Sequence, residues 1–263
     1  MISPVRHLFH VCTYFVSWLW FGLGGLALNA VCAFLLLLPH RNSLSAHARA
    51  AIRWLFSWWL KWCHATGALR VAWHNFPPAP LPSGVVYIAN HPSLIDAPVL
   101  LSVLTDCICI FKPALQRNPC IAPAAILAGY SSGDSGIDLI RDVAEKVAAG
   151  RSLLIFPEGT RTTPGHHLDR LKPGFALIAQ RAGAPIRLIT LKATPRLVAR
   201  GVPWWKPPCF PARLEVRLHE EILPEIGKSA AEITAYVQDR LASLAPVVPA
   251  SGDSCRPPGP TSC

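Results

Sequence analysis

The chain has 263 residues, of which 51% are hydrophobic and only 15% charged, and its formal net charge is +10. Soluble domains carry about 25% charged residues, so this composition argues against an ordinary soluble protein and favours one that is associated with a membrane. A positive surface would suit nucleic acid or anionic lipid. The Lys and Arg residues are scattered, however, and no nucleic-acid-binding motif occurs, so we expect an anionic membrane surface and no nucleic acid as the partner.

The nine cysteines are odd in number and include no C-x-x-C pair. Cys107 and Cys109 alternate along an apolar run that is typical of a strand. This spacing favours small apolar side chains in a reducing compartment over a disulfide framework or a zinc site.

The first apolar stretch, residues 7–38, is interrupted by few polar side chains. A helix over residues 12–38 would be about 40 Å long, enough to cross a ~30 Å hydrocarbon core with tilt. It is too long for the apolar region of a signal peptide, so we expect it to be retained. Gly24 and Gly25 lie at its centre and could kink it, which leaves a re-entrant hairpin open as the alternative to a transmembrane span.

The charges around this stretch are unequal. Arg41, Arg49 and Arg53 follow it, whereas Arg6 alone among the arginines and lysines precedes it. Cytoplasmic flanks are enriched in Lys and Arg. We therefore predict a protein of the cell inner (cytoplasmic) membrane with its active site on the cytoplasmic side.

A second helix is predicted over residues 46–65, and it has one polar stripe with tryptophans beside it. The stripe consists of Arg49, Arg53, Ser57, Lys61 and His64, and the tryptophans are Trp54, Trp58, Trp59 and Trp62. A narrow basic stripe flanked by indoles is typical of a helix at the level of the lipid headgroups. The alternative is a helix packed against the core of the enzyme.

A proline-rich linker, residues 75–82, divides the chain. We predict a membrane anchor over residues 1–80, one catalytic domain over 81–245 and a disordered tail over 246–263, which is rich in Pro, Ser and Gly. Within the central region the predicted strands are 85–89, 107–111, 152–156, 187–192 and 213–218, and the predicted helices are 94–104, 137–149, 175–182 and 230–244. This alternation predicts an α/β fold in which helices cover a mostly parallel sheet.

The first motif follows the strand at residues 85–89. His91 lies in the turn Asn90-His91-Pro92-Ser93, and Asp96 comes five residues after His91. Five residues of ideal helix rotate the chain by about 140°, so the two side chains can meet only if His91 is still in the turn and Asp96 begins the helix. We expect Ser93 to cap that helix. A carboxylate beside the imidazole would prepare His91 to act as a general base.

The second motif, Phe156-Pro-Glu-Gly-Thr-Arg161, follows another apolar strand. Together, N-H-x-x-x-x-D and F-P-E-G-T-R in this order resemble the glycerolipid acyltransferase family, and the resemblance covers residues 81–223. It implies transfer of a fatty acyl group from an acyl thioester, carried by acyl-carrier protein or coenzyme A, to a lysophosphatidic acid-like or other lysolipid hydroxyl. No metal or tightly bound cofactor is implied.

The resemblance also assigns roles to individual residues. His91 is the base and Asp96 its partner, while Glu158, Gly159, Thr160 and Arg161 bind the acceptor, with Arg161 pairing its phosphate. Lys112 matches a family lysine and is expected to help the oxyanion; a plain surface lysine is the alternative. Arg170, Lys172 and Gly174 lie where the family has a K-x-G-type stretch.

One family motif is altered in this chain. Family members usually carry G-x-x-F-I-D-R, whose arginine helps to hold the phosphate, and here Ser135 stands in the arginine's place. This departure leaves the identity of the acceptor open, with Arg141 as a possible substitute.

The same segment supports a rival function. Residues 129–133 fit G-x-S-x-G, so Ser131 could be the nucleophile of a serine hydrolase, with Asp169 and His219 as its acid and base. The preceding residues 120–128 hold one proline and several alanines and would make a poor central strand. A non-enzymatic lipid-binding module is disfavoured because both family motifs stand at strand ends.

A last feature is the Trp204-Trp205 pair in a proline-rich stretch followed by Lys206. Indoles beside a lysine are typical of a membrane-interfacial loop. A surface loop whose aromatic side chains pack on the core is the equal alternative.

Overall fold

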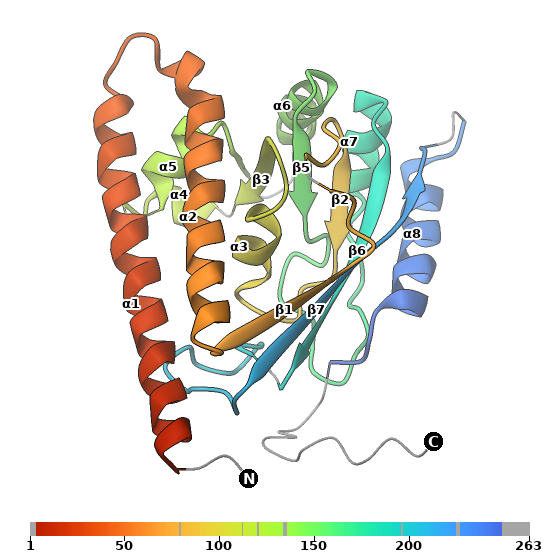
Figure 1. The fold of residues 1–263 in the computed structure, drawn as a ribbon. Helices are drawn as coiled ribbons and strands as arrows, with labels where there is room; N and C mark the ends of the chain where they lie inside the picture. Colours follow the sequence, from red (N-terminus) through yellow and green to blue (C-terminus); the bar gives the residue numbers. More distant parts are fainter. Residues whose placement is uncertain are drawn as a thin grey trace.

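The computed structural model describes residues 4–78, 80–111, 113–119, 121–133, 136–195, 197–224 and 227–248. Its centre is a seven-stranded sheet in the order β1-β7-β6-β2-β5-β3-β4 (Figure 1). The strands are β1 Leu69–His74, β2 Val86–Ala89, β3 Cys107–Phe111, β4 Ser131–Ser132, β5 Ser152–Ile155, β6 Ile186–Thr194 and β7 Ala212–Ile222. Among these strands only the β6–β7 pair is antiparallel, so the predicted α/β fold with a mostly parallel sheet is confirmed.

Helices cover both faces of the sheet (Figure 1). They are α1 Pro4–Leu35, η1 Arg41–Leu44, α2 Ser45–Ala65, α3 Asp96–Leu101, α4 Pro113–Gln116, α5 Ala122–Leu127, α6 Ile137–Ala148, α7 Gly174–Ala182 and α8 Ala230–Leu244. Tyr87 and Ala89 of β2 pack in the core that includes α2 and α3, whereas Val86 and Ile88 pack in the core that includes α6, α7 and α8. Because alternate side chains point to opposite faces, a strand buried on both sides reads as a continuous apolar run.

Two strands lie where the sequence did not indicate them. β1 forms parallel pairs with β7 and so belongs to the sheet, although it lies within residues 1–80. β4 has only two residues and pairs with the end of β3. β1 is only partly buried and β4 is very short, so neither has the apolar run of a central strand.

The N-terminal part is a helical hairpin in which α2 returns along α1 (Figure 1). α1 is uninterrupted through Gly24 and Gly25, so the chain does not turn back within it. A Cβ added at Gly24 would lie 2.8 Å from a methyl carbon of Leu55 in α2, whereas nothing lies within 4 Å of a Cβ at Gly25. Gly24 thus gives the space for close helix packing and does not kink the helix.

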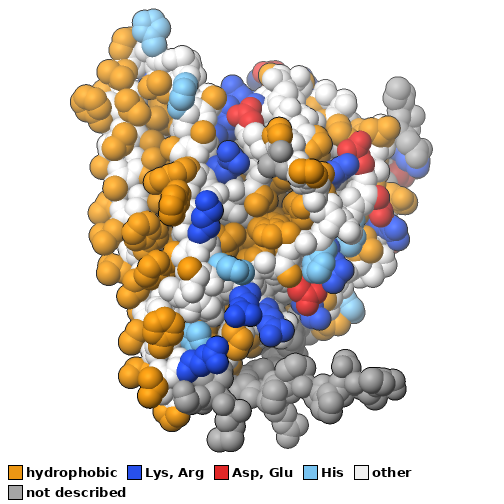
Figure 2. Space-filling model, in the orientation of Figure 1, with side chains coloured by type: hydrophobic (Ala, Val, Ile, Leu, Met, Phe, Trp, Pro, Cys, Tyr) orange, Lys and Arg blue, Asp and Glu red, His pale blue; other side chains and the backbone are white. Residues whose placement is uncertain are grey.

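From His10 onward, the buried side chains of α1 are mostly polar and its exposed side chains are apolar. The buried polar set is His10, Thr13, Tyr14, Ser17 and Asn29. The outward set includes Leu8, Phe9, Phe15, Leu19, Trp20, Leu23, Leu26 and Phe34, and Figure 2 shows hydrophobic side chains covering the left edge formed by α1 and α2. In the part of the chain that the structure describes, α1 is the one helix long and apolar enough to cross a membrane, and 11% of its most apolar window is buried.

α2 uses one face for packing and leaves another exposed. Arg49, predicted to lie in the membrane-facing stripe, is buried, and its Nε donates to Asp106 at 2.6 Å. Ser57 likewise donates to the carbonyl of Ser102. The indoles of Trp54, Trp58 and Trp62 are exposed, whereas Trp59 is buried. One face of the helix therefore packs on the domain, as in the core-helix alternative, and the location of the exposed tryptophans at the headgroups stays a prediction.

Two smaller expectations need correction. Cys209 is disulfide-bonded, which contradicts the expectation that the cysteines are unpaired, because spacing along the chain does not show which cysteines meet in the fold. Residues 246–248, assigned to a disordered tail, are held in place, since the Val248 amide donates to the His166 carbonyl at 2.8 Å. The rest of the predicted tail, residues 249–263, lies outside the described residues.

Candidate active site

The parallel strands β2, β5, β3 and β6 end at one edge of the sheet, and both sequence motifs follow strands that end there. This edge is the usual ligand site of open α/β sheets. His91 follows β2 in a turn, and Asp96 is the first residue of α3. Nδ1 of His91 lies 2.9 Å from Oδ2 of Asp96, so the two side chains meet in the way that their spacing requires.

Ser93 does not cap α3 as expected, because the helix begins three residues later. Its hydroxyl accepts from the amide of Ile95 at 3.3 Å, while its own amide donates to Oδ2 of Asp96 at 2.7 Å. The carboxylate of Asp96 therefore organises the turn as well as the imidazole.

Asp96 is fully buried. Burial raises the pKa of its carboxyl above the ordinary value, against the opposing effects of the hydrogen bonds from His91 and Ser93 and the charge of Arg161. Oδ1 is buried without a partner among the described residues. The Ser93 amide donates to Oδ2, which fits the charged carboxylate. A carboxylate 2.9 Å from Nδ1 favours the tautomer with its hydrogen on Nδ1, in which Nε2 is free to accept a proton.

Asn90 fixes the point where β2 becomes the turn. Its fully buried side chain accepts from the amide of Leu191 at 2.8 Å and donates to the carbonyl of Leu191 at 3.0 Å. The amide group thus replaces a backbone pair between β2 and β6. This extends the hydrogen-bonded ladder to the residue before His91.

Glu158 connects the two motifs. Oε1 accepts from the amide of His91 at 2.9 Å and from the hydroxyl of Thr162 at 2.8 Å, and Oε2 accepts from the amide of Asp169 at 2.9 Å. Burial raises the pKa of Glu158, while these hydrogen bonds oppose the rise. The structure thus places this predicted acceptor-binding residue beneath the site, where it holds the turn of His91 against the loop after β5.

Phe156 supports the imidazole from one side. Its ring stacks on that of His91 with the centroids 4.2 Å apart and 22° between the planes. The His91 side chain keeps 18% of its surface exposed. Stacking restricts the ring, and the remaining exposure gives a substrate access to it.

Arg161 and Lys172 bring positive charge to the same loop. Nη1 of Arg161 donates to the carbonyls of Val198 and Ala199 at 2.8 and 3.1 Å. Gly159 has φ +72°, and Nζ of Lys172 lies 3.0 Å from where a Cβ on Gly159 would be. Within the described part of the chain no carboxylate pairs with Lys172, so a glycine at 159 allows an unpaired ammonium to lie over the motif loop.

Of the remaining predicted residues, the structure describes two and leaves two outside the described ranges. Thr160 is exposed on this loop. Arg141 is also exposed and pairs with Asp138 at 3.0 Å. Lys112 and Ser135 lie outside the described residues.

The hydrolase alternative is not assembled. Ser131 lies in β4 after helix α5, not in a sharp turn after a strand, and its hydroxyl donates to Asp142 at 2.6 Å. Asp169 bonds Thr163 and His166. His219 bonds Thr190 through Nε2 at 2.8 Å, so these three groups each have other partners.

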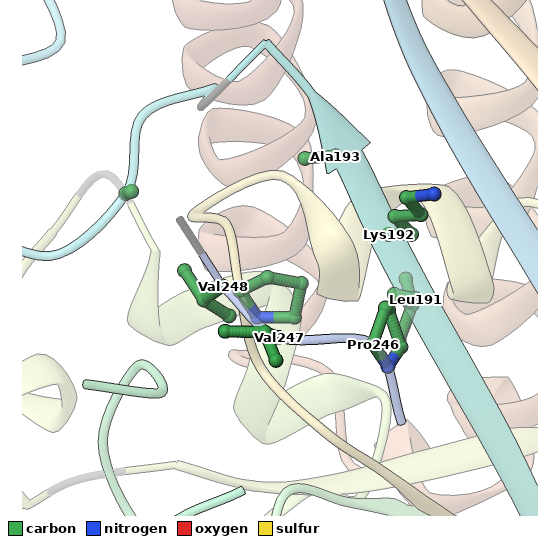
Figure 3. Close-up of a pocket in the computed structure, with 8 residues that line it drawn as sticks. Leu191, Lys192, Ala193, Pro246, Val247 and Val248 are labelled. Carbon is green, nitrogen blue, oxygen red and sulfur yellow. The ribbon is translucent and has the colours of Figure 1, made fainter. Parts of the chain in front are cut away.

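A small pocket lies between the end of β6 and residues 246–248 (Figure 3). It is lined by Pro92, Leu191, Lys192, Ala193, Ala199, Pro246, Val247 and Val248. Its lining is apolar apart from Lys192 and includes none of the polar motif side chains. No group of His, Cys, Asp and Glu with the arrangement of a metal site occurs among the residues the structure describes.

Comparison with known proteins gives three findings. Residues 70–192 match the family model described as Acyltransferase. The chain is 33% identical over 132 residues to the chloroplastic 1-acyl-sn-glycerol-3-phosphate acyltransferase BAT2 of Brassica napus, covering 48% of this chain and 38% of that protein. It is 33% identical over 112 residues to the lyso-ornithine lipid O-acyltransferase of Pseudomonas aeruginosa, covering 41% of this chain and 42% of that protein.

A solved structure covers much more of the chain. The 1-acyl-sn-glycerophosphate (LPA) acyltransferase PlsC from Thermotoga maritima matches 92% of this chain and 95% of its own, with a TM-score of 0.67 and 20% identity. The alignments to the two curated relatives span well under half of their lengths, whereas the shared fold extends over α1 and α2. The chain is thus similar to acyltransferases over residues 70–192, which carry both motifs, and it shares the fold of PlsC.

Proposed function

We propose that the protein is a membrane-bound O-acyltransferase that moves a fatty acyl group from an acyl thioester to the hydroxyl of a lysolipid with an anionic headgroup. The single observation that carries this proposal is the His91–Asp96 pair at the carboxyl edge of the sheet, with one face of the imidazole stacked on Phe156. The names of the two relatives, which act on 1-acyl-sn-glycerol-3-phosphate and on lyso-ornithine lipid, support a lysolipid acceptor.

The chemistry follows from the hydrogen positions. Nε2 of His91 accepts the proton of the acceptor hydroxyl, and the hydroxyl oxygen forms a bond to the thioester carbonyl carbon. The tetrahedral intermediate then breaks its carbon–sulfur bond, and the leaving thiolate takes the proton back from His91. Asp96 stabilises the imidazolium throughout. Acyl-carrier protein and coenzyme A both present such a thioester.

The acceptor headgroup would be held by two cations. Nε and Nη2 of Arg161 have no bond to another described residue, and the ammonium of Lys172 lies on the neighbouring Gly159. A planar guanidinium and an ammonium together suit a phosphate. Lys172 would thus supply a second cation in a chain that has Ser135 where an arginine is usual.

The outward face of α1 supports attachment to the membrane. Leu19, Leu23 and Leu26 are each at least half exposed. Large exposed apolar patches on a protein mark interaction sites. Contact with a bilayer would bring a lysolipid and the active site to the same surface. We place the active site at the cytoplasmic face of the inner membrane because more positive charge follows α1 than precedes it.

The test uses purified full-length protein in detergent with an acyl thioester and a panel that includes lysophosphatidic acid and lyso-ornithine lipid. We expect ester formation with wild type and a loss of about 10²- to 10⁴-fold with His91→Ala. A Ser131→Ala variant should keep its transfer activity. Full activity of His91→Ala would contradict the assignment of the base, and thioester hydrolysis lost only in Ser131→Ala would establish the hydrolase instead.

A further inference from the structure

The loop between β6 and β7, residues 197–211, packs against the N-terminal half of α1 (Figure 1). The ring of Phe210 stacks on His10 with centroids 5.4 Å apart, and the indoles of Trp204 and Trp18 lie 5.8 Å apart. The Tyr14 hydroxyl donates to the carbonyl of Trp204. The polar, inward side of α1 is therefore the side that fixes this loop.

The tip of the loop is apolar and exposed. Trp204 and Trp205 are 48% and 61% exposed, and their rings lie 6.0 Å apart. Phe9 and Phe15 on α1 are also exposed, and Lys206 follows the two tryptophans. Two exposed indoles beside a lysine, on a segment packed along the apolar helix, match the requirements of a bilayer interface, where indoles lie at headgroup depth and a cation meets lipid phosphate.

The base of the same loop holds a residue of the site. The carbonyls of Val198 and Ala199 are the acceptors for Nη1 of Arg161. Both residues are buried, and the Val198 carbonyl also accepts from the amide of Leu94 in the turn after His91. Only four residues of chain, 200–203, separate Ala199 from Trp204, and the Val202 amide donates to the Ala199 carbonyl at 3.0 Å. A displacement of the tip therefore reaches the acceptors of the guanidinium over a short path.

We propose that Trp204, Trp205 and Lys206 form a bilayer-contact loop for anionic lipid, and that this contact, through Val198 and Ala199, sets the position of Arg161. The loop then links attachment of the enzyme to the membrane with its affinity for the acceptor. This inference rests on the proposed function only in taking Arg161 as an acceptor-binding residue. The contact itself is independent of the reaction.

The contact is tested by indole fluorescence of the full chain in bilayers of phosphatidylcholine and phosphatidylglycerol, with brominated lipid as the quencher. The comparison is wild type against a Trp204→Phe/Trp205→Phe variant, because phenylalanine keeps an aromatic ring but removes the indole emission. The emission lost in the variant, taken as the difference between the two spectra, should be quenched by brominated lipid, in addition to the emission of the exposed indoles on α1 and α2. If that emission is not quenchable, the loop does not contact the bilayer and the proposal is wrong.

The link to Arg161 is tested by KM for a water-soluble, short-chain lysophosphatidic acid, with the enzyme in detergent micelles or in nanodiscs of anionic lipid. Wild type should show a KM roughly three- to tenfold lower in nanodiscs, with little change in kcat. Trp205→Ala should show the micelle KM in micelles and in nanodiscs. The control Tyr236→Ala, which removes an exposed aromatic ring on α8, should show the same decrease in KM as wild type.

Equal KM values for wild type in the two media, or a Trp205→Ala variant that matches wild type, would overturn the link. Absence of acyl transfer by wild type in every medium would instead contradict the proposed function, and the fluorescence experiment would still decide the contact.

Discussion

At the scale of single residues, Glu158 shows how a motif carboxylate can serve the site without touching a substrate. Both of its oxygens accept hydrogen bonds inside the protein, from the turn of His91, from Thr162 and from Asp169. Its charge would also repel an anionic acceptor if it faced one. We interpret it as the residue that holds the two motif loops together.

Glu158→Gln tests this interpretation. The new amide group must turn its N–H₂ toward at least one buried donor, so we expect the free energy of unfolding to fall by about 1–3 kcal/mol. The midpoint of thermal unfolding in detergent measures this, with Glu145→Gln on the exposed side of α6 as the charge-matched control. An unchanged midpoint together with a raised KM for the acceptor would instead make Glu158 a direct contact.

A second residue-scale prediction concerns Lys172. Lys172→Met keeps most of the side-chain length and removes the charge beside Gly159, so KM for lysophosphatidic acid should rise about tenfold while kcat changes little. Arg181→Met, which removes an exposed charge at the end of α7, should leave KM unchanged. If Lys172→Met raises KM equally for an acceptor that lacks phosphate, Lys172 does not bind the phosphate of the headgroup.

The sequence predicted the meeting of His91 and Asp96 because strand, turn and helix leave only one way for side chains at that spacing to touch. It did not predict the contacts of Glu158 or the place of Lys172. Both depend on partners 11 to 67 residues away, brought together by the order of strands in the sheet. The K-x-G stretch was the one sequence signal for Lys172. The structure adds that the Lys172 ammonium lies beside Gly159, which the sequence alone does not show.

At the scale of elements, the close packing of α1 on α2 requires a residue without a side chain at position 24. Gly24 and Gly25 are neighbours in the same helix, yet only Gly24 faces Leu55. In a helix interior, alanine is favoured over glycine by about 1 kcal/mol. The two positions therefore separate helix propensity from helix packing.

We expect Gly25→Ala to raise the midpoint of thermal unfolding in detergent. Gly24→Ala should raise it less or lower it, since the added methyl group lies 2.8 Å from a Leu55 methyl carbon and must displace it. Equal stabilisation by the two substitutions would show that Leu55 moves aside without cost and that Gly24 is not a packing requirement.

The elements that the sequence predicted well are those buried on both faces of the sheet or amphipathic at helical spacing. The strand Cys107–Phe111 and the helix Ala230–Leu244 agree with their predicted ranges. The helix after His91 is shorter than predicted. The apolar run extends beyond both ends of the helix into turns, and side chains of those turns, such as Ile95 and Leu104, are also buried in the core. β1 was missed because its outer positions are exposed at the edge of the sheet.

At the scale of the whole molecule, the predicted anchor, residues 1–80, and the predicted catalytic domain, residues 81–245, are joined in one sheet. β1 lies within residues 1–80 and completes one edge of the sheet. Arg49 of α2 pairs with Asp106, the residue just before β3. A division of the chain by hydropathy reveals which residues are apolar. It does not reveal that the face of α1 turned toward the domain carries buried polar side chains.

The outward face of α1 gives the prediction at this scale. A Leu19→Asp/Leu23→Asp variant places charges on that face, where each aspartate would cost about 2.5–3.5 kcal/mol in a bilayer. The full-length protein should shift from the membrane fraction toward the soluble or aggregated fraction after sedimentation. Leu223→Asp, equally exposed but beyond the end of β7, should stay with the membranes, and a double variant that remains there as well would exclude α1 as the anchor.

The inverted polarity of α1 also limits how this enzyme can be re-engineered. The Asn29 side chain accepts from the amide of Ala124, and the carbonyl of Ser17 accepts from the indole of Trp59 at 3.2 Å. A chimera that carries a foreign anchor of the same length and hydropathy would deliver the protein to a bilayer but leave the Ala124 amide without an acceptor in the interior. The proposed membrane contact and the packing of the domain thus use opposite faces of one helix. A soluble version of this protein would require polar residues on the outer face of α1, because removal of the helix would also remove the contacts of its inner face.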